Sequence, residues 1–178
     1  MDTSAGSERE GQGLLEASVA AHEHARNLDP LIATSVSHTH YQLANYDSAL
    51  RDMAIGAWGI KGVTLGTMGR TAEAIETFRR LEESQIPPPM RACIVAWRAM
   101  FEGNHDECLQ AAEQCIQDYL DPEGIFYMGL IMSRIGAKDR ALTVLNQSMD
   151  RGFSSFKVLE RNPWFDNLRK TPKFEVLP

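Results

Sequence analysis

Residues 58–78 read WGIKGVTLGTMGRTAEAIETF, and the spacing of the small and apolar residues in this stretch is found twice more along the chain. Gly69 is followed by Gly103 and Gly136, at intervals of 34 and 33 residues. Each glycine precedes a small side chain and then an apolar one at constant spacing: Ala74 and Phe78, Cys108 and Ala112, Ala141 and Leu145. Three columns that share one period predict a helical repeat protein in which each repeat is one hairpin of two helices.

The residue types in these columns suit such a hairpin. Gly62, Ala96 and Gly129 lie before the turns, where a small side chain lets two helices cross closely. A turn glycine can adopt a positive φ and end the first helix. Prolines at 87–89 and at 122 are expected where the second and third hairpins begin, because proline fits the first turn of a helix.

The pattern resembles the tetratricopeptide repeat over residues 55–155. The first copy carries Trp58, Gly62, Leu65, Gly69, Ala74 and Phe78, and the third carries Ile125, Met128, Gly129, Met132, Gly136 and Ala141. The middle copy departs from the pattern with Ala92 at the tryptophan position and Ala99 at a position that is usually large. The resemblance implies an all-α fold, a right-handed α-solenoid of antiparallel helix hairpins whose first helices line a concave groove.

We expect a flexible segment over 1–12 and a single domain over 13–178. Degenerate repeats are expected over 13–54, full repeats over 55–88, 89–121 and 122–155, and a capping segment over 156–178. Within the degenerate part, the apolar spacing predicts helices over 14–27 and 31–43 and another from Tyr46. Residues 47–68 could instead form one long helix, although their four glycines weaken it.

The stretch Asn162-Pro163-Trp164-Phe165-Asp166-Asn167-Leu168-Arg169 resembles the closing segment of tetratricopeptide regions in large bacterial signalling proteins, among them kinases, cyclases and transcription regulators. In that family a short terminal helix covers the last repeat. The resemblance implies that Trp164, Phe165 and Leu168 form the apolar face of a C-terminal capping helix, because a solenoid must cover its last hydrophobic surface. It also implies a bacterial signalling context.

Charge and composition narrow the function classes. The net charge of −6 argues against nucleic acid as the partner, because phosphate binding needs a basic face. Three cysteines without metal-ligand spacing indicate reduced, buried thiols rather than a disulfide framework. Residues 1–13 have no apolar segment typical of a signal peptide, and the chain has no run long enough to cross a bilayer. We expect a cytoplasmic protein that does not bind membranes.

The sequence offers little for catalysis. It contains no nucleophile elbow, no phosphate-binding glycine loop and no zinc-protease motif. His22 and His24, like His38 and His40, are two residues apart, so on a helix the members of each pair face opposite ways and do not chelate one metal ion. We therefore expect no enzyme activity, cofactor or metal.

The first helices of the hairpins supply the expected partner-binding groove. Its lining is predicted to be His38, Tyr41, Gly59, Val63, Gly66, Met90, Cys93, Trp97, Met100, Phe101, Phe126, Leu130 and Arg134. The glycine row, which also includes Gly56, would leave a low floor beside Trp97. Clustered aromatic and methionine side chains suit an apolar side chain from a partner. Burial of this stripe by the chain itself, under the N-terminal helix or as core, and contact between two copies remain open alternatives.

One known mode of groove binding is disfavoured. Family members that hold a terminal carboxylate use lysine, arginine and asparagine, whereas the corresponding positions here are Thr34, Gly59, Cys93 and Phe126, then His38, Val63, Trp97 and Leu130. An apolar or mildly basic protein or peptide segment fits better. The expected function is a non-catalytic scaffold or regulatory module. The alternatives are an accessory domain of a multidomain bacterial signalling enzyme and a small-molecule-binding helper.

Overall fold

The computed structural model describes residues 4–51, 58–118 and 121–174, and every regular element in these ranges is a helix. The elements are α1 (Ser4–Leu28), α2 (Val36–Gln42), α3 (Tyr46–Arg51), α4 (Trp58–Thr67), α5 (Thr71–Glu83), α6 (Pro88–Glu102), α7 (His105–Asp118), α8 (Pro122–Arg134), α9 (Lys138–Asp150), α10 (Phe156–Arg161), the 3-10 helix η1 (Pro163–Phe165) and α11 (Asp166–Arg169). The all-helical class expected from the sequence is confirmed. None of the described helices is both long and apolar enough to cross a membrane.

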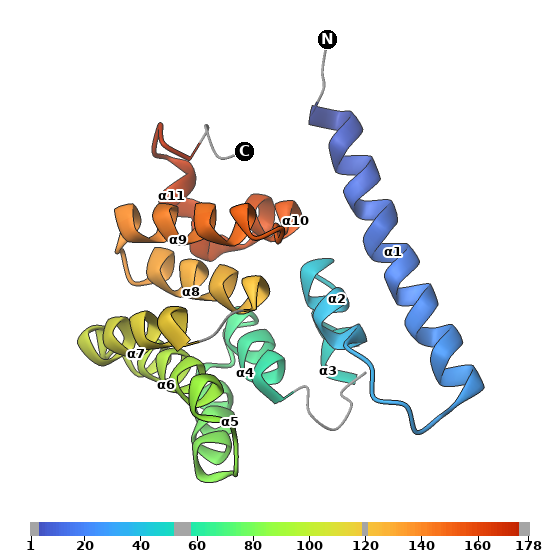
Figure 1. The fold of residues 1–178 in the computed structure, drawn as a ribbon, viewed down its shortest axis with the longest axis horizontal. Coiled ribbons are helices and arrows are strands. Elements are labelled where there is room, and N and C mark those ends of the chain that lie inside the picture. The colour runs from blue at the N-terminus through green and yellow to red at the C-terminus, as the bar shows by residue number, and fades with distance from the viewer. Residues whose placement is uncertain (1–3, 52–57, 119–120, 175–178) are drawn as a thin grey trace.

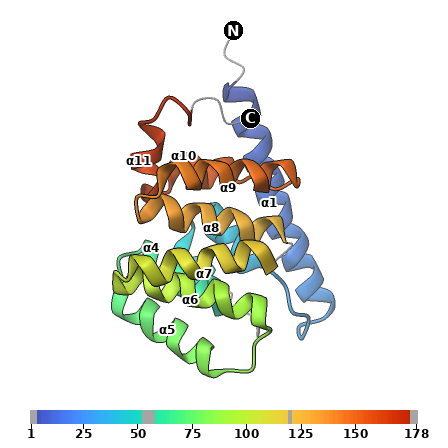
Figure 2. The ribbon, with the colours of Figure 1, turned by 60° about the vertical axis from the view of Figure 1, so that its left-hand side comes forward.

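Helices α4 to α9 form three consecutive hairpins, α4–α5, α6–α7 and α8–α9, which pack side by side (Figures 1 and 2). The turns between their members are built alike. Gly69, Gly103 and Gly136 have φ of 80°, 77° and 87°, so the predicted positive φ of all three is confirmed. The next residue donates its N–H to a carbonyl five residues back, over 2.9 Å each time: Arg70 to Leu65, Asn104 to Ala99 and Ala137 to Met132. This bond pattern ends a helix at a left-handed glycine.

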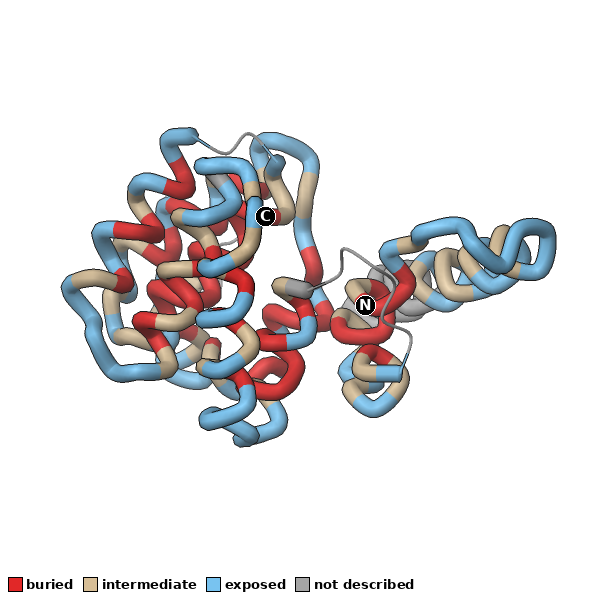
Figure 3. The backbone as a smooth tube through the Cα atoms, turned by 90° about the horizontal axis from the view of Figure 1, so that it is seen from below, coloured by how far each residue is buried: buried red, intermediate tan, exposed pale blue. Residues whose placement is uncertain are grey.

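Close contact within each hairpin depends on the small residues. A Cβ atom built on Gly62 would lie 2.4 Å from Cζ of Phe78, and one on Gly129 would lie 2.9 Å from Cδ2 of Leu145. The small residues of the second helices, Ala74, Cys108 and Ala141, are fully buried. The repeat columns therefore mark the helix crossings, as the spacing predicts. Figure 3 shows the buried residues concentrated between these stacked helices.

The N-terminal part differs from the expectation in several places. Helix α1 begins at Ser4, so residues 4–12, expected to be flexible, belong to this helix, which lies against α2 and α10 at the edge of the molecule. Helix α2 begins only at Val36, so residues 31–35, which were expected to be helical, lie outside it. The third helix begins at Tyr46 as predicted. Residues 52–57, including Gly56, lie outside the described ranges, so the alternative of one helix over 47–68 stays open.

The C-terminal segment packs on α8 through η1, where the apolar side chains expected to form its inner face are at least half-buried. Phe165 and Leu168 are fully buried, and Trp164 is half-buried. The segment also contacts helices other than those of the last hairpin, which the sequence did not indicate. Asn162 Nδ2 donates to the hydroxyl of Tyr41 over 3.0 Å, and the ring of Trp164 lies 5.9 Å from that of Trp97. This segment therefore connects α8 with α6 and α2.

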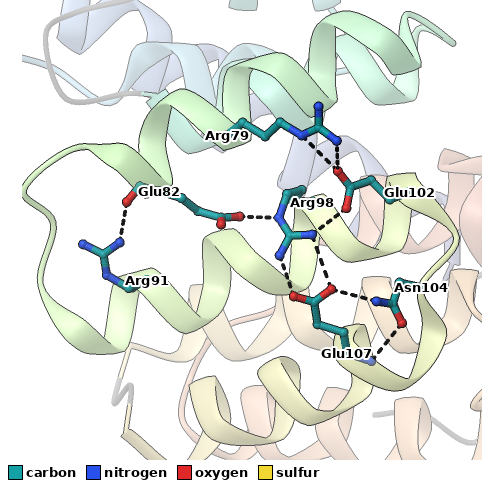
Figure 4. Close-up of polar contacts among 7 residues, drawn as sticks. All are labelled: Arg79, Glu82, Arg91, Arg98, Glu102, Asn104 and Glu107. Atoms are coloured by element: carbon teal, nitrogen blue, oxygen red, sulfur yellow. Dashed lines mark hydrogen bonds and ion pairs between the residues drawn. The ribbon is translucent and has the colours of Figure 1, made fainter.

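A network of charged side chains joins α5, α6 and α7 (Figure 4). Arg98 donates to Glu82 over 2.6 Å, to Glu102 over 2.5 Å and to Glu107 over 2.6 Å. Arg79 donates to Glu102 as well, over 2.7 Å. The Arg98 side chain is only 14% exposed, so it is largely shielded from water and its three carboxylate partners hold its pKa above the usual value.

Replacing Arg98 with methionine is expected to lower the free energy of unfolding by about 1–2 kcal/mol, because three carboxylates lose their shared cation. Arg80→Met is the matched control, since Arg80 is 76% exposed and pairs with Glu76 on its own helix. This control should change the free energy by less than about 0.5 kcal/mol. Urea unfolding followed by circular dichroism measures both, and equal losses would contradict the role of Arg98 as the centre of the network.

Candidate functional site

An apolar cavity of about 400 Å³ lies between α2, α4, α6 and α8, and we call it the apolar cavity. Most of its wall is aliphatic, aromatic or sulfur-containing. Its lining is His38, Gly59, Ile60, Val63, Leu81, Ile86, Met90, Cys93, Ile94, Trp97, Asp121, Glu123, Gly124 and Tyr127. Pockets that bind ligands usually span roughly 300–1,000 Å³ and combine an apolar wall with a few polar groups. The apolar cavity has both properties.

Stacked and tilted aromatic rings hold the wall beside Trp97. Trp97 is only 2% exposed, and its ring lies 6.2 Å from that of Phe78, 6.3 Å from that of Phe101 and 6.3 Å from that of Tyr127. Trp164 adds a fourth contact from the C-terminal segment. Part of the Trp97 side chain therefore lines the apolar cavity, and the remainder is packed in the core.

A polar group occupies the end of the apolar cavity where α8 begins. Glu123 Oε1 lies 3.1 Å from Nδ1 of His38, 3.2 Å from the hydroxyl of Tyr127 and 3.5 Å from Nε2 of Gln42. Burial alone would raise the pKa of Glu123, but the hydrogen bond and charge of His38, aided by Tyr127 and Gln42, offset this and bring the pKa below its usual value. Glu123 is therefore an ionised carboxylate in a largely apolar wall at neutral pH.

The thiol on the cavity wall is not activated. Contact with the Cys115 side chain, together with burial, holds the pKa of Cys93 well above its usual value. A nucleophilic cysteine needs a lowered pKa, because the thiolate is the reactive form. Burial likewise raises the pKa of Cys108 to about 12. Both thiols stay protonated at neutral pH and act as small apolar side chains.

A second cavity, of about 560 Å³, lies at the end of the hairpins that carries the glycine turns. Its lining is Gly66, Thr67, Gly69, Thr71, Met100, Phe101, Glu102, Gly103, His105, Arg134, Ile135 and Trp164. Among the described residues, the two cavities share no lining residue, since the packed rings of Trp97, Phe101 and Trp164 lie between them. The single groove predicted from the sequence is thus two separate cavities.

The predicted groove residues divide into three sets. His38, Gly59, Val63, Met90, Cys93 and Trp97 line the apolar cavity. Gly66, Met100, Phe101 and Arg134 line the second cavity. The remaining three line neither: Tyr41, Phe126 and Leu130 are at most 2% exposed and belong to the core. Their side chains therefore offer almost no surface to a partner in this structure.

Packing by other parts of the chain explains the burial of Tyr41 and Phe126. The ring of Phe126 lies 5.4 Å from that of Phe153 and 6.2 Å from that of Phe165, so the C-terminal segment covers this face of α8. Tyr41 is enclosed between Tyr46, at 5.8 Å, and Tyr127, at 6.2 Å. Other parts of the chain therefore bury these residues: the C-terminal segment covers Phe126, and α3 and α8 cover Tyr41.

One member of the glycine row does not form the open floor expected from the sequence. A Cβ atom on Gly66 would lie 1.9 Å from Cζ of Phe101. The ring of Phe101 therefore fills the space beside Gly66. Gly59 leaves room for a side chain, since a Cβ atom there would make an ordinary van der Waals contact with Cδ1 of Ile94 at 3.8 Å and Gly59 lines the apolar cavity.

Sequence reasoning missed Glu123 and Tyr127, which supply the polar end of the apolar cavity. The prediction placed Phe126 and Leu130 on the groove side of α8, whereas the side that faces the cavity carries Glu123, Gly124 and Tyr127. Glu123 and Tyr127 are four residues apart and therefore share a helix face. A carboxylate one turn before a tyrosine was the available signal.

The histidine pairs lie on α1 and α2, as expected. In the part of the chain that the structure describes, no group of three or more His, Cys, Asp or Glu side chains could hold a metal ion. Comparison with known proteins adds no relative: no family model, no curated protein and no solved structure matches this chain.

Proposed function

We propose that this chain is a non-catalytic binding module that holds an apolar side chain of a partner protein segment in the apolar cavity. The proposal includes the resemblance described above, with the three hairpins as tetratricopeptide-like repeats of a right-handed α-solenoid. The intervals of 34 and 33 residues and the repeated glycine turns support this arrangement. Protonated thiols and the absence of known catalytic motifs from the sequence support a binding role rather than catalysis.

The apolar cavity is the observation that carries the proposal. It brings together six of the predicted groove residues, from three different helices, around about 400 Å³ of space. Met90 is 39% exposed at this site, and methionine adapts its shape to different apolar partners. A partner side chain that enters the apolar cavity would be surrounded by Val63, Ile94 and Trp97.

A cavity-filling substitution tests this function. Peptides are first selected on the wild-type protein from a phage-displayed random library, and their dissociation constants are then measured by fluorescence anisotropy. Gly59→Leu adds a side chain to the wall of the apolar cavity beside Ile94 without removing any side-chain contact, and leucine favours the helix over glycine. Lys61→Leu is the matched control, because it adds the same side chain to the exposed face of α4.

The selected peptides should bind Gly59→Leu at least about tenfold more weakly than wild type, a loss of about 1.4 kcal/mol, and should bind Lys61→Leu as wild type. Equal binding to all three proteins, or a selection that enriches no peptide, would contradict the proposed function.

A second candidate is a helper protein that binds a small molecule, which the same volume of about 400 Å³ also favours. Native mass spectrometry of the purified protein separates the two candidates, since a retained compound of one defined mass, displaced by the Gly59→Leu side chain, would favour the small molecule. The further proposal of an accessory domain in a bacterial signalling protein, in the cytoplasm, rests on the resemblance of residues 162–169 and on the reduced cysteines.

A further inference from the structure

The apolar cavity has an unbalanced charge. Two of its lining residues, Asp121 and Glu123, carry carboxylates, and its one basic lining group is the imidazole of His38. No lysine or arginine lies among the lining residues that the structure describes. Asp121 is the N-cap of α8 and uses Oδ1 to accept the N–H of Glu123 over 3.0 Å. Of the two carboxylates, Glu123 is the one that side chains of α2 and α8 hold in position.

The two oxygens of Glu123 differ. Oε1 is within hydrogen-bond distance of His38, Tyr127 and Gln42, which fix the position of the carboxylate from α2 and from α8 itself. Within the described ranges, neither a hydrogen bond nor an ion pair reaches Oε2, although the side chain is 26% exposed. Oε2 is therefore free to accept a hydrogen bond from a cationic donor, and charge-assisted hydrogen bonds are about twice as strong as neutral ones.

On the basis of the proposed function, we propose that the bound segment carries a lysine or arginine beside its apolar side chain, and that Oε2 of Glu123 accepts a hydrogen bond from this cation. The apolar side chain fills the space between Gly59 and Trp97, and the basic group reaches the end of the apolar cavity at α8. His38, Tyr127 and Gln42 act as positioning residues, since they hold the carboxylate through its other oxygen. The net charge of −6 favours approach of a basic segment.

Selection on variant proteins tests this specificity. The same random peptide library is selected on wild type, on Glu123→Gln and on Asp139→Asn. The Asp139 control removes one negative charge from a side chain that is 86% exposed and lies outside the apolar cavity. Lysine and arginine should be enriched next to the apolar residue on wild type and Asp139→Asn, and this enrichment should be lost on Glu123→Gln. Thermal unfolding verifies that all three proteins are folded.

A change in the peptide tests the charge specificity on the wild-type protein, so the result does not depend on how a variant protein folds. Acetylation of the lysine in a selected peptide removes its charge, and the acetylated peptide should bind wild type about tenfold more weakly. Peptides that require Gly59 but show no basic enrichment, and that tolerate acetylation, would overturn the charge specificity and leave the proposed function in place. If no selected peptide depends on Gly59, the proposed function fails, and the charge specificity fails with it.

Discussion

Replacing Trp97 with alanine is expected to lower the free energy of unfolding by about 3–5 kcal/mol, the usual cost of removing a buried aromatic side chain. Trp97 is 2% exposed and touches rings from α5, α6, α8 and the C-terminal segment. The substitution removes all of these contacts and leaves a space that rigid neighbouring rings do not fill. Such a loss is a large part of the stability of about 5–15 kcal/mol that proteins of this kind have.

Urea unfolding followed by far-UV circular dichroism measures this loss. Trp97→Phe should cost less, about 1–2 kcal/mol, because a smaller ring keeps part of the stacking. Met90→Ala, at the same cavity but 39% exposed, should cost less than about 1 kcal/mol. If Trp97→Ala keeps wild-type stability and only peptide binding falls, Trp97 is an exposed groove residue rather than part of the core.

Replacing Gly66 with alanine is expected to destabilise the protein by about 2–3 kcal/mol, even though alanine is the better helix former by about 1 kcal/mol. The added Cβ would lie 1.9 Å from Cζ and 2.3 Å from Cε1 of Phe101. Phe101 lines the second cavity, but its ring lies 6.0 Å from that of Phe78, 6.3 Å from that of Trp97 and 5.7 Å from that of Trp164, so a move away from α4 disrupts these ring contacts. The overlap therefore outweighs the gain in helix propensity.

Gly59→Ala is the control on the same helix, and it should stabilise the protein rather than destabilise it. Its Cβ meets no atom closer than Cδ1 of Ile94 at 3.8 Å, so the helix propensity gain of up to about 1 kcal/mol is retained. Melting temperatures of the two variants give the comparison directly. Destabilisation by both substitutions, or stabilisation by both, would contradict the packing of Phe101 against α4.

The hairpin fold could be predicted because its signal is local. Turn glycines and small residues recur with one period, and each acts within its own hairpin, as Gly62 does with Phe78 and Gly129 with Leu145. A period in the sequence therefore reports on these contacts without knowledge of the rest of the fold.

The candidate site could be predicted only in part, because long-range packing decides it. His38, Gly59 and Cys93 lie on the inner faces that the repeat pattern indicates. The burial of Phe126 depends on Phe153 and Phe165, and Tyr41 packs against Tyr127 and accepts a hydrogen bond from Asn162, which is 121 residues away in the chain. No periodic pattern records such contacts. The same reason explains why Gly66 was expected to be part of an open floor, although Phe101 fills the space beside it.

Photo-crosslinking tests the central claim, binding in the apolar cavity, most directly. A selected peptide is synthesised with a photoreactive diazirine leucine at its apolar position and is irradiated with the wild-type protein, and mass spectrometry identifies the labelled residues. The account predicts labelling of Met90, Ile94 and Tyr127, which line the apolar cavity. Labelling confined to the second cavity, at Met100 or Trp164, or to the exposed faces of α5 and α7 would contradict it.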